Sequence, residues 1–77
     1  MNIYEKARQQ FTPEAAEVEY EKHLRQLAAL DAAGKNDTDE ADAIREKMEL
    51  PWLAMDDDGM KRMTDLSISL LEDAETK

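Results

Sequence analysis

The sequence predicts an all-α protein, a small three- or four-helix bundle made of a helical hairpin and a C-terminal helix. Valine occurs once, at Val18, and this scarcity of β-branched apolar residues disfavours strands. Hydrophobic residues make up 42% of the chain, which favours folding over wholesale disorder. Proline and capping residues divide the chain into segments whose apolar residues recur at helical spacing. Because 77 residues supply one thin core, we expect a single helical domain over residues 1–77.

A short leading helix is predicted over residues 1–11. Ile3, Ala7 and Phe11 recur every four residues and therefore share one face of a helix. Pro13 follows closely, and the residue before a proline avoids the helical backbone region. We therefore expect a break before the next helix, in preference to one long helix with a kink.

The second helix is predicted over residues 13–33, and both of its ends carry clear signals. Thr12 is a typical N-cap residue, and Pro13 suits the first helical position. Gly34 is placed to end the helix, since glycine adopts the left-handed conformation of a C-terminal cap. The predicted inward stripe consists of Ala16, Tyr20, His23, Leu24, Leu27 and Leu30.

The third helix is predicted over residues 38–49, antiparallel to the second. Asp37 and Glu40 resemble a capping box, and the helix is expected to end before Pro51. Its apolar face is sparse and consists of Ala41, Ile44 and Met48. Residues 51–55, Pro-Trp-Leu-Ala-Met, are then predicted to form an apolar corner, either as a tight connector or as a single helical turn.

The last main helix is predicted over residues 57–72. Asp56 is the expected N-cap residue, and two further aspartates follow in the first turn, where the helix dipole favours anions. The predicted inward stripe consists of Met63, Leu66, Leu70 and Leu71, and Ile68 falls outside it. This helix completes the expected bundle.

No constellation of residues predicts catalysis, a metal site or a cofactor. Cysteine is absent, which excludes disulfides and thiolate ligands, and His23 is the one histidine. The run Asp56–Gly59 lacks the ligand spacing of a calcium loop, so we interpret its acids as helix-start residues. His23 falls on the apolar stripe of its helix, where we expect a structural or interface role. The chain is therefore predicted not to be an enzyme.

The charge of the chain limits its partners. Nineteen acidic and ten basic residues give a formal net charge of −9. This charge disfavours direct binding to nucleic acid or to an anionic membrane, and it favours a partner with a basic surface. No window approaches the roughly 20 apolar residues of a membrane span. The first ten residues resemble neither a signal peptide nor a mitochondrial presequence, so we expect a cytoplasmic protein.

The run Leu50-Pro51-Trp52-Leu53-Ala54-Met55-Asp56, followed later by Leu66-Ser67, is similar to a pattern in short bacterial helical proteins of unassigned function. In those proteins an acidic helix precedes a Pro-Trp corner, and a capped final helix follows it. The likeness covers residues 37–71. This chain departs from it at Asp56, where Ser or Thr is expected, and at Gly59, where an acid or Gln is expected. The resemblance supports the helical prediction and implies no activity.

These observations predict a non-catalytic accessory or adaptor protein that binds another protein. Two surfaces are candidates for the contact. One is the apolar corner of Trp52, Leu53 and Met55, and the other is the acidic face of Asp39, Glu40, Asp42 and Glu46. Trp52 also suits the core of the corner, and we prefer that interpretation. Two alternative functions stay open: an acidic inhibitor that occupies a basic, nucleic-acid-binding groove of a target protein, and a homodimer that completes its core between two hairpins.

Overall fold

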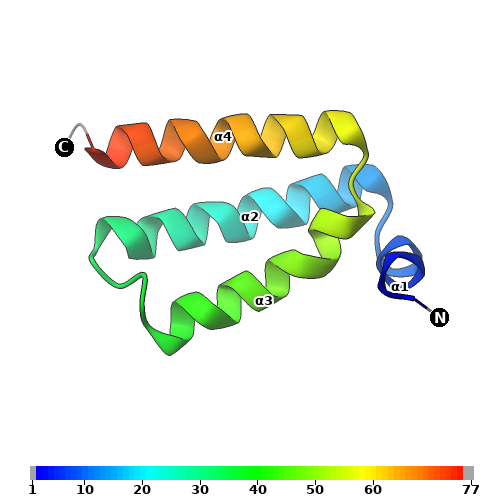
Figure 1. The fold of residues 1–77 in the computed structure, drawn as a ribbon, viewed down its shortest axis with the longest axis horizontal. Helices are drawn as coiled ribbons and strands as arrows, with labels where there is room; N and C mark the ends of the chain where they lie inside the picture. The colour runs from blue at the N-terminus through cyan, green and yellow to red at the C-terminus, as the bar shows by residue number, and fades with distance from the viewer. Residues whose placement is uncertain (1, 76–77) are drawn as a thin grey trace.

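The computed structural model describes the backbone of residues 2–75 and the side chains of residues 2–72. These residues form four helices and no strand, so the predicted all-α class and small helical bundle are confirmed. The helices are α1 (Ile3–Gln10), α2 (Pro13–Ala32), α3 (Asp39–Ala54) and α4 (Asp57–Glu75). Helices α2 and α4 run in the same direction, and α3 runs in the opposite direction (Figure 1).

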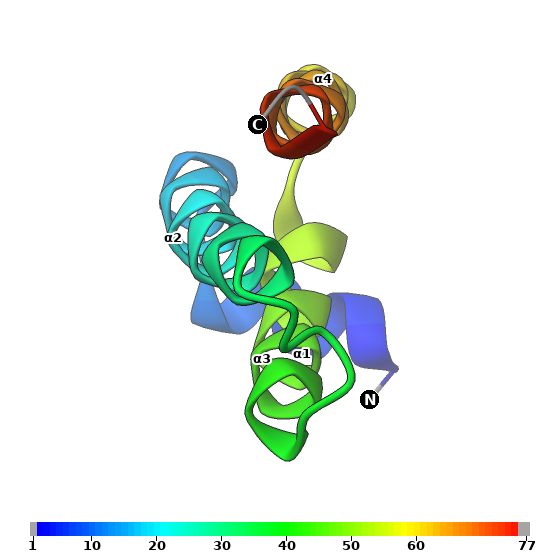
Figure 2. The same cartoon turned by 90° about the vertical axis from the view of Figure 1, so that its left-hand side faces the viewer.

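The three long helices form a shallow arc with α2 at its apex (Figure 2). Helix α3 packs against one side of α2 and α4 packs against the other, while α1 packs against α3. The molecule measures 42 × 27 × 15 Å along its principal axes. Its shortest dimension is little more than the diameter of one helix with its side chains, about 10–12 Å. Helices α3 and α4 hardly touch each other, so the arc is open between them.

The predicted ends of α2 are confirmed. The hydroxyl oxygen of Thr12 accepts a hydrogen bond from the Ala15 N–H at 3.2 Å, which caps the first turn. At the other end, Gly34 has a φ of 74°, a conformation that a Cβ atom disfavours. The N–H of Lys35 donates to the carbonyl of Leu30 at 2.8 Å, completing a Schellman motif that turns the chain toward α3.

Helix α3 begins and ends later than the sequence predicts. Its N-cap residue is Thr38, whose hydroxyl oxygen accepts from the Ala41 N–H, whereas the prediction placed the cap at Asp37. The predicted stop before Pro51 is wrong, because the helix continues through this residue to Ala54. Proline removes one backbone hydrogen bond, but the ring of Pro51 is completely buried. This burial favours the helical path that proline alone disfavours.

Helix α4 begins as predicted. The carboxylate of Asp56 accepts a hydrogen bond from the Gly59 N–H at 2.7 Å, and two aspartates occupy the first turn. The helix continues to Glu75, beyond the predicted end at residue 72. The acids of this run are therefore accounted for by the start of a helix.

The core consists of two clusters along α2. The buried residues are Ala7, Ala16, Ala54, Met55 and Met63 in the first cluster, and Leu24, Ile44 and Met48 in the second. Tyr20 and Leu66 pack against both clusters and connect them. The second cluster is buried between α2 and α3, whereas α4 adds one buried apolar side chain, Met63, among those described. The hairpin of α2 and α3 therefore carries most of the core.

Candidate partner-binding groove

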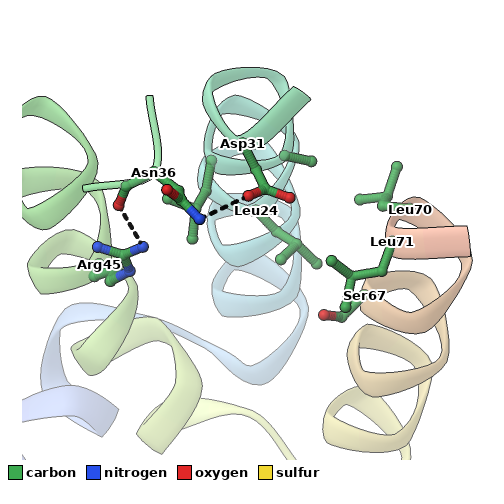
Figure 3. Close-up of a pocket in the computed structure, with 9 residues that line it drawn as sticks. Leu24, Asp31, Asn36, Arg45, Ser67, Leu70 and Leu71 are labelled. Atoms are coloured by element: carbon green, nitrogen blue, oxygen red, sulfur yellow. Dashed lines mark hydrogen bonds between the residues drawn. The ribbon is translucent and has the colours of Figure 1, made fainter. Parts of the chain in front are cut away.

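An apolar groove follows α2 on the open side of the arc, between α3 and α4. Two hollows of about 220 and 460 Å³ make up this groove, and they share Leu27 and Arg45. The first hollow is lined by Leu24, Leu27, Ala28, Asp31, Asn36, Arg45, Ser67, Leu70 and Leu71 (Figure 3). The second is lined by Tyr20, Leu27, Arg45, Met48, Glu49, Trp52 and Leu53. The groove therefore has its floor on α2 and a wall on α3 along both hollows, while α4 supplies the opposite wall at the first hollow.

One face of α2 forms the floor of the groove. Tyr20, Leu24, Leu27 and Asp31 recur every three or four residues, so successive turns each present one side chain to the groove. Between the first and the last of them the floor is about 16 Å long, at a rise of 1.5 Å per residue. Leu24 is 7% exposed, whereas Leu27 is only partly buried, so the floor still offers apolar surface.

The wall on α3 includes the single tryptophan of the chain. Trp52 packs on Tyr20, with the ring centroids 5.3 Å apart and the ring planes inclined by 43°. Trp52 and Leu53 are partly buried, pack against the first core cluster and also line the groove. Burial raises the pKa of the Tyr20 hydroxyl above its usual value, so this part of the floor is uncharged. Trp52 thus combines a core contact with a surface that a partner can reach.

The wall on α4 is apolar and largely open to solvent. Leu70 is partly buried, whereas Leu71 is 53% exposed and borders the groove (Figure 3). The sequence predicted Leu71 as part of an inward stripe, and this prediction is wrong. The reason is that α4 has α2 as its main neighbour, so its apolar stripe is wider than the contact that covers it. Ile68 is 51% exposed and lies outside the lining of the groove.

Charged groups stand along the α3 side of the groove. Arg45 donates to the Asp42 carboxylate and to the Asn36 carbonyl, both at 2.9 Å, so its charge is already paired. The Asn36 side-chain amide donates to the Asp31 carboxylate at 2.9 Å (Figure 3). Among the described side chains, neither Asp31 nor Glu49 forms an ion pair with a cation. Carboxylates that lack a cationic partner among the described side chains therefore stand at this wall, as Glu49, and on the floor, as Asp31.

The structure separates the apolar residues that the sequence predicted as a partner surface. Trp52 and Leu53 line the groove. Met55, the C-cap residue that follows α3, is 5% exposed and belongs to the first core cluster. Met55 is therefore a packing residue of the corner and not part of the groove.

The acidic residues predicted for the same surface fall on different sides of α3. Asp42 borders the groove through its ion pair with Arg45. Glu40 and Glu46 line shallow depressions away from the groove, and Asp39 is exposed in the first turn. The acidic run is thus continuous in sequence but not in space.

Of the residues that line the groove, Trp52 and Leu53 alone were predicted as site residues; Leu27, Arg45, Glu49 and Leu71 are among those that were not. The two leucines carry the helical periodicity that predicts a core, and this periodicity alone cannot show which part of a stripe a neighbour covers. The useful signal was the width of the apolar stripe on the last helix, which exceeds what one neighbouring helix buries.

His23 is buried, with 7% of its surface exposed. Its Nε2 lies 3.0 Å from a carboxylate oxygen of Glu19, and its Nδ1 lies 3.3 Å from the side-chain oxygen of Gln26. Both ring nitrogens thus have partners on the same helix, which suits a structural role. Within the described residues, no group of three or more His, Asp or Glu side chains is placed to hold a metal ion.

Comparison with known proteins gives no relative for this chain: no protein-family model, curated protein or solved structure matches it. The resemblance of residues 37–71 to short bacterial helical proteins stays a prediction. None of the described helices is long and apolar enough to cross a membrane.

Proposed function

We propose that this chain is a non-catalytic accessory or adaptor protein that binds another protein through the groove between α3 and α4. One observation carries the proposal: α4 packs mainly on α2, and this leaves an apolar groove where a closed bundle would bury its side chains. Apolar surface of this kind, rimmed by polar groups, is typical of sites where proteins bind one another. We expect the complex to form in the cytoplasm, as the composition of the chain predicts.

Two side chains are the expected anchors of the contact. Tryptophan is the residue type most enriched at binding hot spots, and Trp52 is held in place by its packing on Tyr20. Leu71 is 53% exposed at the opposite wall, so a partner that covers it removes apolar surface from water. A partner that touches both residues would span the groove and bury its floor.

The proposal is tested by photo-crosslinking from single positions in an extract of the source cells. A photoreactive phenylalanine analogue replaces Leu71 in one variant and Val18 in the other. Val18 is 71% exposed on α2, about two and a half turns from Leu27, so it faces away from the groove. A discrete protein crosslinked from position 71, and absent from position 18, supports the proposal. Equal crosslinking from both positions, or no crosslinked protein from position 71, contradicts it.

A further inference from the structure

On the basis of that proposed function, we propose what occupies the groove: an amphipathic α-helix of a partner protein that carries lysine or arginine along one edge. The apolar face of this helix would lie on α2 and α4. Its basic edge would lie along α3. Shape, charge and the composition of this chain's own helices each contribute to the inference.

The shape of the groove fits a helix. Its floor is about 16 Å long, which is the length of about eleven helical residues. Both walls are themselves helices, so an added helix would lie on α2 and α3 along both hollows and also meet α4 at the first, which would close the open arc into a bundle. An extended peptide needs an exposed strand edge for its backbone hydrogen bonds, and the described residues contain no strand.

The charge on the two walls differs, and this difference selects the orientation of the partner. On α3, Glu49 lines the second hollow, and Arg45, the one cation among the lining residues, is already paired with Asp42. On α4, Ser67, Leu70 and Leu71 line the first hollow, none of them is charged, and no α4 residue lines the second hollow. A basic group is therefore favoured next to α3 and an apolar one next to α4.

A second copy of this chain fits the groove less well. Helices α2, α3 and α4 each carry more carboxylates than cationic side chains, so each would bring like charge to the α3 wall. Helix α1 has a small excess of cations, but it has eight residues and already packs on α3. The net charge of −9 on each copy adds a general repulsion.

The inference is tested with two synthetic peptides of about 14 residues, or about four helical turns. Both have the same leucine face, and one edge carries lysine in the first peptide and glutamate in the second. Binding to the full chain is followed by the fluorescence of Trp52, the single tryptophan, and by NMR shifts of backbone amides. We expect the lysine peptide to bind about tenfold more tightly. This preference should shrink as salt rises from about 50 mM to about 500 mM.

Matched variants locate the binding site. Leu71→Ser should weaken the lysine peptide about tenfold, whereas Ile68→Ser, at the same exposure on the same helix but outside the groove, should leave its affinity unchanged. Glu49→Gln should reduce the preference for lysine over glutamate. Glu46→Gln removes the same charge from the same helix away from the groove, and it should reduce that preference less.

Four results would overturn the inference. Equal affinity for the two peptides would show that the groove does not select charge, and binding of neither peptide would show that it does not take a helix. NMR shifts centred on the exposed acids away from the groove would place the peptide elsewhere. A dimer that Leu71→Ser dissociates would make a second copy the occupant. The crosslinking experiment decides separately whether any protein binds the groove, so the two proposals can fail independently.

Discussion

Helix α3 packs on two neighbours, α2 and α1, whereas α4 packs mainly on α2. The hairpin of α2 and α3 buries Leu24, Ile44 and Met48 between its two helices, while α4 contributes Met63. Both regions are amphipathic helices with an apolar stripe, and both start with a capped first turn. The same local pattern, a capped amphipathic helix, is therefore buried by its neighbours in one region and leaves an exposed apolar face in the other.

The polar contacts of the two regions differ in the same way. The loop between α2 and α3 is held by the Schellman motif at Gly34 and by the hydrogen bond from Arg45 to the Asn36 carbonyl. Helix α4 is tied to α2 by the exposed ion pair between Arg62 and Glu17. Local opening of α4 therefore breaks fewer contacts than opening of the hairpin, and elements of this kind open first.

The largest expected effect on the free energy of unfolding is that of Met48→Ala, a substitution in the hairpin. Met48 is 8% exposed. Removing a buried methionine side chain costs about 2–5 kcal/mol. Because a core of this size rarely supplies more than about 3–5 kcal/mol in total, we expect the variant to be largely unfolded. The loss in the free energy of unfolding is measured by urea titration, with circular dichroism as the signal. A loss below about 1 kcal/mol would show that the hairpin is not the stable region.

The same change in the other region, Met63→Ala, is expected to have a smaller and more local effect. Met63 is 4% exposed, so it is buried to a similar extent as Met48. If α4 detaches while the hairpin stays folded, the loss in global stability cannot exceed the free energy that holds α4 to α2. We expect amides of α4 to exchange about tenfold faster or more, and amides of the hairpin to keep their protection. Hydrogen exchange followed by NMR measures both. Equal acceleration of amide exchange in α4 and in the hairpin would show that the two regions do not differ in this way.

The caps of α2 and the start of α4 were the parts of the fold that the sequence predicted best, because they depend on short-range contacts. The Thr12 cap joins residues three apart, and Gly34 ends α2 through hydrogen bonds to its own last turn. The passage of α3 through Pro51 was not predictable in this way. The ring of Pro51 is completely buried in the fold, and this tertiary burial favours a path that the local preference of proline disfavours.

The candidate groove was predicted in part, for a similar reason. Trp52 and Leu53 stood out by composition, and the structure places both at the groove. Leu27 and Leu71 could not be told from core residues, because periodicity defines a face but not the neighbour that covers it. That α4 would pack on α2 and hardly on α3 is a tertiary outcome. No single helix contains the information that decides it.

The smallest expected effect on stability comes from the two helix caps, and it sharpens the comparison because each variant removes an N-cap acceptor; Thr38→Ala also removes the hydrogen bond that this hydroxyl donates to the Lys35 carbonyl. Asp56→Ala removes the cap of α4, and Thr38→Ala removes the cap of α3. Losing an N-cap of this type costs about 1 kcal/mol.

For Thr38→Ala we expect this cost in global urea unfolding, since α3 unfolds with the hairpin. For Asp56→Ala we expect faster amide exchange within α4 and little change in the hairpin. A cost of Asp56→Ala that appears equally in the exchange of α2 and α3 would mean that α4 is an integral part of the folding unit, and the open groove would then be a rigid surface.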